Sequence, residues 1–471
     1  MPETLCLAVS DILEVTVLSV FLNILTTVGL IVIAILLFEL IIFFHEGGHF
    51  VAAKLSGIKV NEFALGMGPK IFSFKRKETT YSLRLFPIGG FCAMEGEDAD
   101  SENPRAFNNA KIYKRMIVII AGALMNIILG LIFMGIILAP SEYFTTTTVT
   151  DFSPKAYSAN SGLEVGDKIL SVDGYAVNNS MDLSYALSKI KVQDVDGTEI
   201  QIYKQDCCNS LYEAYAKLVN DGTISDDATN NAAFEAVCKG ADLINDAQNS
   251  KEAYEALQQA VVGLSQTVPN VSITIDAIDI QETRPRYRAD IEVQRNGERV
   301  KLENVDFVTY VTEDNSEPQM AIDFYLDAKD NNFGNLIVET GSQTVSVVRM
   351  VYDSLYGMVT GQYSINDLSG PVGIATVAVE VAQTGLENSG FGEAVNNIIY
   401  IMMVITVNLG IVNMLPFPAL DGGRFVFLLI EAIFRKPIPR KVEAIVNGVG
   451  LALLLILIAL ITFKDVFKLF M

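Results

Sequence analysis

The sequence predicts an α-helical membrane protein with four transmembrane helices, a membrane-associated β-hairpin region on the cytoplasmic side, and a soluble outer domain with a helical insertion. The chain has 471 residues, of which 51% are hydrophobic, and its mean hydropathy is +0.36. The apolar residues are gathered in four long runs, and about 20 such residues suffice to cross a bilayer. The charged residues are sorted between the connecting loops, with bases in two of them and acids in a third.

The first apolar run, residues 20–44, reads VFLNILTTVGLIVIAILLFELIIFF and holds one acid and no base. It is longer than the core of a signal peptide. It therefore predicts a transmembrane helix over residues 17–55, preceded by a short segment of residues 1–16. Three further runs predict the other spans, over residues 116–139, 391–425 and 441–465.

The charges of the loops orient these spans. Eleven Lys and Arg residues lie between Lys54 and Arg115, and five lie between Arg424 and Lys441. Because basic loops stay in the cytoplasm, the loop of residues 56–115 and the loop after the third span are expected there. The first 16 residues carry three acids and no base, so the N-terminus is expected outside.

A large acidic block lies between the second and third spans. Between Glu142 and Glu339 there are 34 Asp and Glu residues against 15 Lys and Arg, within a net charge of −21 for the chain. This block is expected outside, and its sign argues against binding to nucleic acid. Its three cysteines leave three interpretations open: a zinc thiolate site, a disulfide outside the cell, or ordinary thiols. They are Cys207, Cys208 and Cys238.

The only two histidines of the chain lie four residues apart, in His45-Glu46-Gly47-Gly48-His49. On a helix this spacing puts both imidazoles on one face, where they can bind one metal ion. Glu46 then lies beside the metal, where a general base for water is needed. A metal-free pair is the alternative, but the rest of the chain uses no histidine. The motif ends a transmembrane helix, unlike that of a soluble zinc protease.

A catalytic zinc needs three protein ligands and one open position, so the third ligand must be an acid or a cysteine. Glu39 lies six residues before His45, about 240° around the helix, and so points away. Asp421 is the best candidate, because it follows two prolines in NMLPFPALDGG at the end of the third span. Such non-helical backbone at membrane depth is tolerated only against protein or a cavity. The alternative is that Asp421 only caps a helix at the interface.

HEGGH at the end of the first span, with NMLPFPALDGG at the end of the third, resembles the site-2 protease family of intramembrane zinc metalloproteases. The bacterial branch that cleaves anti-sigma factors is the most similar. The resemblance implies that Zn²⁺ is held by His45, His49 and Asp421 and that Glu46 activates water.

The same resemblance extends to two asparagines and to the second span. Asn413 matches the family residue that holds substrate backbone near the metal, and Asn408 also matches. One departure is residues 121–126, AGALMN, where members usually read AGPxxN, so Ala123 stands in place of a proline.

Residues 56–115 contain short alternating runs separated by Gly and Pro, which predict antiparallel strands and hairpins. Their aromatic and aliphatic residues would make one face apolar enough to enter the membrane boundary. In the resembled family such a hairpin dips beside the active site, and Gly90 and Phe91 match its glycine–phenylalanine segment. An exposed strand edge could hold an unwound substrate by β-augmentation. Alternatively, the sheet only covers the metal site from the cytosol.

The outer block contains SGLEVGDKILSVDG, residues 161–174, which resembles the PDZ domain of bacterial proteases. A domain in two parts is expected, over residues 140–203 and 284–334, with Asn296-Gly297 as a hairpin turn. Residues 204–283 between these parts are Ala-rich with helical periodicity, as in a helical insert on a loop. An acidic spacer and a regulatory role both remain open for it.

In the resembled family the PDZ domain filters substrates, which another protease trims first. Residues 335–390 are expected to return to the membrane as an amphipathic segment, which contains the matching motif SGPVGI at residues 369–374.

The resulting hypothesis is a zinc endopeptidase of the bacterial cell membrane that cuts single-span membrane proteins, such as anti-sigma factors or signal-peptide remnants, within the lipid. Its active site would face the cytoplasm, with the PDZ domain and insert outside. Membrane lipid and single-span substrates are the expected partners. Two alternatives are a non-catalytic adaptor with a structural metal site and an ion transporter. A transporter would show paired repeats, which the sequence lacks.

Overall fold

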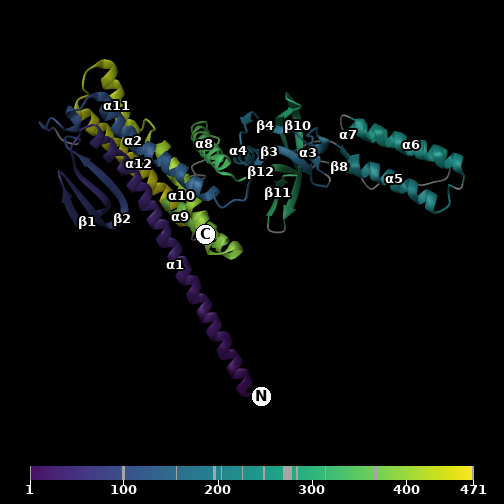
Figure 1. Cartoon of the computed structure of the whole chain (residues 1–471), viewed down its shortest axis with the longest axis horizontal. Coiled ribbons are helices and arrows are strands. Elements are labelled where there is room, and N and C mark those ends of the chain that lie inside the picture. Colours follow the sequence, from purple (N-terminus) through teal and green to yellow (C-terminus); the bar gives the residue numbers. More distant parts are fainter. Residues whose placement is uncertain are drawn as a thin grey trace. The chain divides into compact units, whose positions relative to one another are not determined.

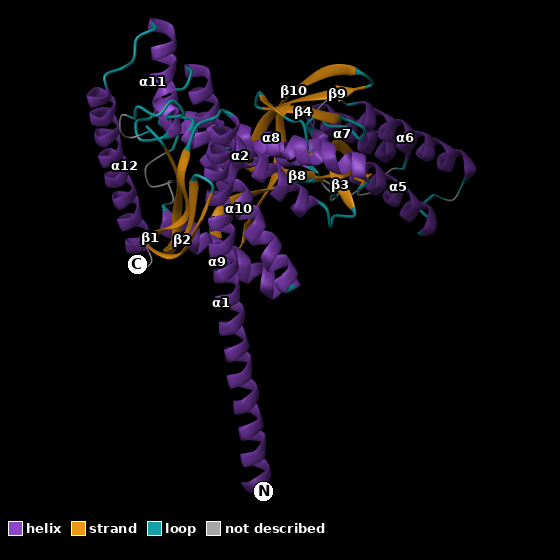
Figure 2. Ribbon diagram, turned by 60° about the vertical axis from the view of Figure 1, so that its left-hand side comes forward, coloured by secondary structure: helices purple, strands orange, loops and turns teal. Residues whose placement is uncertain are grey.

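The computed structural model describes residues 2–468 except for 98–100, 155, 195–197, 203, 225, 248–249, 269–277, 283–284, 313–314 and 364–369. The chain forms two compact units (Figure 2). The first joins residues 1–141 to residues 336–471, and the second comprises residues 142–335.

Four helices of the described residues are long and apolar enough to cross a membrane, which fits a polytopic membrane protein. The spans are Val28–Leu55, Ile112–Leu138, Phe391–Asn413 and Lys441–Lys468. They lie in helices α1 (Pro2–Leu55), α2 (Ile112–Leu138), α10 (Phe391–Asn413) and α12 (Arg440–Lys468). The first three run beside one another in Figure 1. Helix α2 packs against both α1 and α10.

Small residues allow this close packing, because a helix in lipid associates through van der Waals contact rather than through the hydrophobic effect. A Cβ atom at Gly410 of α10 would lie 3.0 Å from the backbone oxygen of Ala123 in α2. One turn earlier on α10, Thr406 donates a hydrogen bond from its hydroxyl to the backbone oxygen of Asn126, at 3.2 Å. The third span is therefore held in register with the second.

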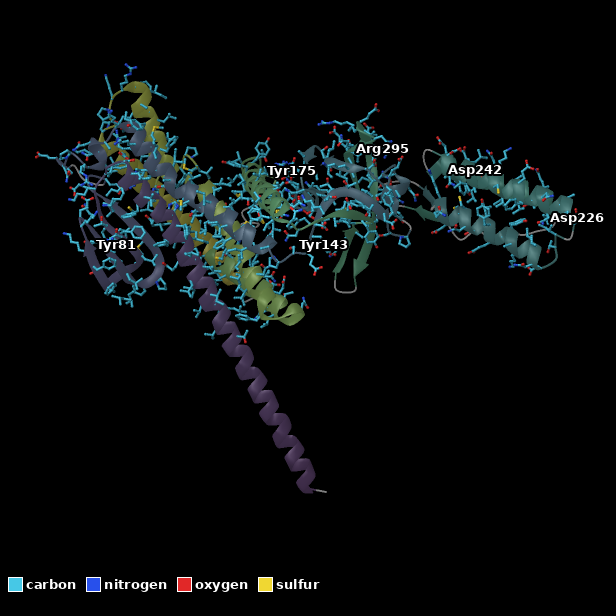
Figure 3. All side chains as sticks on the ribbon, in the orientation of Figure 1. Tyr81, Tyr143, Tyr175, Asp226, Asp242 and Arg295 are labelled. Carbon is cyan, nitrogen blue, oxygen red and sulfur yellow. The ribbon has the colours of Figure 1, made fainter. Side chains whose placement is uncertain are left out.

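The loop after α1 forms the antiparallel strands β1 (Val60–Arg76) and β2 (Thr79–Met94). Both strands bend, so that residues 60–65 pair with residues 80–83 on one side and with residues 90–94 on the other. Phe63 anchors the sheet to α1, with its ring centroid 5.8 Å from that of Phe43 and 5.2 Å from that of Phe50. Tyr81 of this sheet is labelled in Figure 3.

The hairpin strands expose a large apolar surface. The side chains that form it are about half exposed or more, and they are Met67, Ile71, Phe72, Phe74, Leu83, Leu85 and Phe86. The sheet packs beside a helix that is long and apolar enough to span the membrane. Lipid contact would therefore remove this surface from water.

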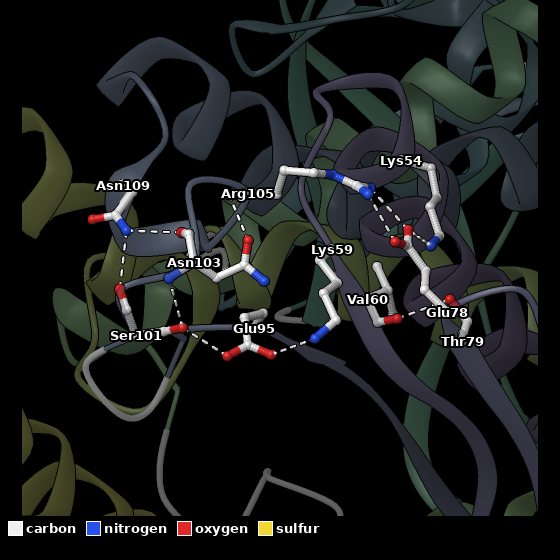
Figure 4. A network of polar contacts seen from close by, with 10 residues as sticks. All are labelled: Lys54, Lys59, Val60, Glu78, Thr79, Glu95, Ser101, Asn103, Arg105 and Asn109. Atoms are coloured by element: carbon white, nitrogen blue, oxygen red, sulfur yellow. Dashed lines mark hydrogen bonds and ion pairs between the residues drawn. The ribbon is translucent and has the colours of Figure 1, made fainter.

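A network of ion pairs joins the hairpin to the end of α1 (Figure 4). Glu78, in the turn between β1 and β2, accepts hydrogen bonds from Lys54 at 2.8 Å and from both terminal nitrogens of Arg105, at 2.7 and 2.8 Å. Lys59 donates to Glu95 at 3.0 Å. These contacts therefore tie the hairpin turn to the C-terminal end of α1 and to the segment before the 3-10 helix η1 (Phe107–Asn109).

We predict that acid weakens this tie through Glu78. The Arg105 and Lys54 side chains lower the pKa of Glu78 from 4.5 to about 2. Its stabilisation is then complete above the unfolded pKa and is lost as pH falls towards 2. Glu78→Gln should cost no more than about 1 kcal/mol at pH 6, because the pair is partly exposed. The difference in unfolding temperature from wild type should shrink towards pH 3. The control is Glu102→Gln. If it lowered the unfolding temperature as much as Glu78→Gln does, the effect could not be assigned to the ion pairs of Glu78.

The second unit is built on a sheet with the strand order β11-β10-β9-β4-β3-β12, in which β5 also pairs with β4 and β6 with β9. The strands are β3 (Tyr143–Phe152), β4 (Lys168–Val172), β5 (Tyr175–Ala176), β6 (Val192–Asp194), β9 (Pro285–Arg295), β10 (Glu298–Thr312), β11 (Asn315–Ala321) and β12 (Phe324–Asp330). Strands β7 (Thr198–Ile202) and β8 (Ile278–Glu282) form a separate pair. Helices α3 (Tyr157–Asn160) and α4 (Ser180–Ser188) complete the unit.

The motif in residues 161–174 folds as a turn followed by the expected strand β4. Arg295 holds that turn: it donates to both carboxylate oxygens of buried Asp167, at 2.8 and 2.7 Å (Figure 3 labels Arg295). Asn296 and Gly297 both have positive φ, 52° and 89°, between the paired strands β9 and β10. The predicted hairpin turn is therefore confirmed.

The segment with helical periodicity contains α5 (Lys204–Asn220), α6 (Asp227–Asp246) and α7 (Ser250–Thr267). These helices share a core of their own, which includes Leu211, Ile244 and Leu264. Asp226, labelled in Figure 3, caps α6 by accepting a hydrogen bond from the backbone N–H of Thr229 at 2.8 Å. The three cysteines of the insert have free thiols.

The chain re-enters the first unit through α8 (Phe333–Val359) and α9 (Pro371–Ser389). The buried side chains of α8 are mostly polar, whereas its exposed ones include Ile337, Val345 and Tyr352, as expected for a helix whose outer face contacts lipid. At the start of α9, Asp465 of α12 accepts hydrogen bonds from the backbone N–H groups of Gly370 and Gly373. The first residue of the SGPVGI motif lies outside the described residues.

Candidate metal centre

Three side chains converge at the end of the first span. The Nε2 atoms of His45 and His49 lie 3.4 Å apart. Asp421 places its Oδ2 atom 3.4 Å from the first nitrogen and 3.3 Å from the second. Among the described His, Cys, Asp and Glu side chains, these three form a group whose ligand atoms lie close enough together to hold one metal ion. The structure therefore brings together the three ligands expected from the sequence.

This geometry fits zinc. Zinc lies about 2.0–2.2 Å from imidazole nitrogen and carboxylate oxygen, so tetrahedral coordination separates neighbouring ligand atoms by about 3.4 Å. The three observed separations agree with that value. Asp421 Oδ2 is buried and accepts no hydrogen bond from the described residues. Such an oxygen is costly to bury unless a cation or donor meets it.

Each histidine is oriented by a contact of its other ring nitrogen with α2. His49 Nδ1 lies 2.8 Å from the backbone oxygen of Val118, to which it donates. His45 Nδ1 lies 3.2 Å from the side-chain amide of Asn126. Both contacts leave Nε2 facing Asp421, so helix α2 sets the direction of both imidazoles.

The chain breaks its helix to bring Asp421 into place. Helix α10 ends at Asn413, and α11 (Asp421–Phe434) begins with the aspartate itself. The connecting residues 414–420 are non-helical and fold back over the first turn of α11. A Cβ atom at Gly422 would collide with the backbone of Leu415, and one at Gly423 with that of Phe417. The two glycines after Asp421 are therefore required by this close approach.

Glu46 and the hairpin meet beside the three ligands. A Cβ atom at Gly90 would lie 3.0 Å from Ile42 Cγ2 and 3.5 Å from Glu46 Cγ. The next residue, Phe91, packs its ring 4.8 Å from the guanidinium carbon of Arg84. Gly90 of the predicted glycine–phenylalanine segment thus lies close to the predicted base.

The two asparagines named from the sequence differ in position. Asn413 places its Nδ2 atom 3.5 Å from His45 Nε2, on the ligand side of the ring. Asn408 is exposed on α10, and five residues of helix separate the two by about 140°. The structure brings Asn413, but not Asn408, to the metal centre.

Comparison with known proteins identifies the family of this chain. Residues 33–457 match the family described as Peptidase family M50. The chain belongs to this family. A relative from Clostridium acetobutylicum is 33% identical over 93% of this chain and 97% of its own length. The zinc metalloprotease RasP of Bacillus licheniformis is 31% identical over 93% of this chain and 98% of its own. The regulator of sigma-W protease RasP of Bacillus subtilis is 29% identical over 94% of this chain and 100% of its own length.

The protein is therefore a zinc metalloprotease of the site-2 type, and it is a membrane protein. No role at the metal was predicted for three residues of this protease that orient or approach the candidate ligands: Val118, Gly122 and Asn126. The last two lie in the segment AGALMN, which was matched to the family but given no role. The first acts through a backbone carbonyl, which leaves no signal in a side-chain pattern. The other two lie four residues apart, so they share a face of α2, but that face is known only once its partner helix is known.

We predict that Gly122→Ala removes most of the bound zinc from this protease. The added Cβ atom would collide with His49 Nε2 and with the adjacent edge of the His45 ring, so the imidazoles must move out of ligand geometry. Zinc per chain, measured on the purified protein by atomic emission, should fall well below that of wild type. The matched control is Gly47→Ala within the motif, where an added Cβ meets no atom within 4 Å. Equal zinc in both variants would refute the prediction.

Proposed function

We propose that this protease hydrolyses peptide bonds within the transmembrane segments of single-span membrane proteins, with His45, His49 and Asp421 as the zinc ligands. The observation that carries the proposal is the position of the ligands. Two of them lie on a helix long and apolar enough to span the membrane, and the third lies at the start of α11, seven non-helical residues after another such helix. A substrate bond must therefore reach the depth of these helices.

When bound, zinc supplies a Lewis acid that polarises the scissile carbonyl and acidifies water. Glu46 follows His45 directly and lies on the same helix end, so its carboxylate can take the proton of the attacking water and pass it to the leaving amine. Asn413 lies next to the His45 ring, where its amide can hydrogen-bond the substrate backbone. In this scheme Glu46 is the general base, and Asp421 serves only as a metal ligand.

The sheet beside the site is suited to hold an unwound substrate. A helical substrate satisfies its backbone amides internally, and opening it in lipid without new partners costs several kcal/mol for each group. Residues 90–94 pair with residues 60–65 on one side, and no described strand pairs with their other side. That edge begins at Gly90, against Glu46, so β-augmentation there would present an extended substrate next to the base.

Water for hydrolysis can be stored in a polar cavity of about 350 Å³ in the same unit. The cavity is lined by residues of the segment after β2 and of α2, α11 and α12. Four of the lining residues form two ion pairs, Arg424 with Glu97 at 2.5 Å and Arg115 with Glu431 at 2.6 Å. We propose that this side faces the cytoplasm, because the basic loops lie at this end of the spans.

The second unit is proposed to lie outside the cell as a PDZ domain with a helical insert, and to admit substrates that another protease has trimmed. Its acidic composition and the motif in residues 161–174 support this assignment. One relative is named regulator of sigma-W protease. We therefore propose anti-sigma factors, or remnants of signal peptides, as the substrates. Membrane fragments that accumulate in a strain carrying Glu46→Gln would identify them by mass spectrometry.

Glu46→Gln tests the catalytic role. The amide cannot accept the proton of water, so cleavage of a tagged single-span substrate should fall by at least about 10²-fold. Zinc content and unfolding temperature should stay at wild-type values, because Glu46 is not a ligand in this scheme. Retained cleavage would rule out Glu46 as the base.

Asp421→Asn tests the third ligand. A neutral amide is a much weaker zinc ligand than a carboxylate, so the purified variant should hold less zinc and lose it at lower chelator concentration. Unchanged zinc stoichiometry and affinity would exclude Asp421 from the site. Cys92→Ala, which changes a buried thiol of the hairpin, serves as the control and should keep its zinc.

A further inference from the structure

We propose that Asn126 is a positioning residue for the metal centre, whose side-chain oxygen accepts a hydrogen bond from Nδ1–H of His45. The inference rests on the proposed ligand set, and it assigns a role within that set to a residue of the second span. Asn126 is fully buried, with 0% of its surface exposed, and its amide lies 3.2 Å from His45 Nδ1.

The protonation of His45 follows from its position. Its Nε2 atom is the one that faces His49 Nε2 and Asp421 Oδ2, each at 3.4 Å. A nitrogen that binds a metal must offer a lone pair, so Nε2 carries no hydrogen. In a neutral imidazole the single hydrogen is then on Nδ1, which must donate.

The partner of that hydrogen must be an acceptor. The Nδ2 atom of Asn126 is the amide atom assigned next to His45 Nδ1. Two hydrogen-bond donors, Nδ2–H of Asn126 and Nδ1–H of His45, would then face each other. The Oδ1 atom of the same amide is buried and has no hydrogen-bond partner among the described residues. The two orientations of a side-chain amide, which exchange oxygen and nitrogen, have nearly the same shape. The hydrogen-bond network therefore decides which atom is the oxygen. Rotation by 180° about χ2 removes both faults, because Oδ1 then accepts from Nδ1–H.

The backbone of Asn126 is held in place from the third span. Thr406 donates to its backbone oxygen at 3.2 Å, and a Cβ atom added at Gly410 would lie 3.3 Å from Asn126 Cβ. The side chain therefore has little freedom to leave the ring. Helix α10, which also ends next to Asp421, thus positions the residue that orients His45.

The two histidines differ in how they can be perturbed. His49 donates to the backbone oxygen of Val118, a contact that no substitution at position 118 removes directly. His45 depends on the side chain of Asn126. Loss of an outer partner of a metal-bound imidazole typically weakens metal binding by about 10–100-fold, so Asn126 should tune zinc affinity through His45.

The test compares three variants of the full-length protein, purified in detergent. Asn126→Leu keeps the size of the side chain but removes the acceptor, and its zinc affinity, measured by competition with a chromophoric chelator, should fall by about 10–100-fold. Asn126→Asp keeps an acceptor at the same place and should bind zinc at least as tightly as wild type. Asn397→Leu makes the same exchange in α10, where the amide donates to the backbone oxygen of Val381 at 3.2 Å, and should leave zinc affinity unchanged.

A second readout separates positioning from a general loss of structure. The Co²⁺-substituted protein should show an altered visible absorption spectrum in Asn126→Leu and a wild-type spectrum in Asn126→Asp. Unchanged zinc affinity in Asn126→Leu would overturn the proposal, and so would an equal loss in Asn126→Asp. If Asn126→Leu fails to fold, a loss of affinity in Asn126→Asp alone still overturns it. Failure of the ligand set itself would appear separately, as unchanged zinc binding in Asp421→Asn.

Discussion

The close packing of α2 against α1 and α10 is the constraint on which the metal centre depends. Two imidazoles and a carboxylate cannot be buried at membrane depth unless their polar atoms have partners. Helix α2 supplies partners for the two imidazoles, the backbone oxygen of Val118 and the amide of Asn126, and its Gly122 leaves room for the rings. The two proposed histidine ligands are therefore oriented by a helix that contributes no proposed ligand itself.

The connection after α10 and the β1–β2 hairpin supply the polar groups that hydrolysis needs between apolar helices. The third span must stop being helical to present Asp421, and glycines at positions 422 and 423 allow the turn to fold back on itself. The hairpin brings an unpaired strand edge to Glu46, which offers hydrogen bonds that lipid cannot. Its turn is tied to the end of the first span by Glu78, so the edge and the base belong to one packed region.

Much of the fold could be predicted because it is encoded locally. The four apolar runs, the period-2 pattern of the hairpin and the Asn296-Gly297 turn each depend on neighbouring residues, and the structure contains them. The bends of β1 and β2, by which residues 60–65 acquire two strand partners, could not be predicted. Glycines with positive φ lie at the bends, at positions 66, 68 and 89, but which segments the bends bring side by side depends on pairing between distant parts of the hairpin.

The sequence by itself determined the histidine pair, the candidate base between them and the need for an acid or a cysteine as third ligand, because helical spacing and the shortage of histidines restrict the choice. Only the tertiary structure decided that Asp421 lies 3.3–3.4 Å from both histidines, that Asn413 faces the site while Asn408 does not, and that Asn126 meets His45. These contacts join residues up to several hundred positions apart. They depend on the rotation and depth at which the helices pack, and no local pattern encodes those quantities.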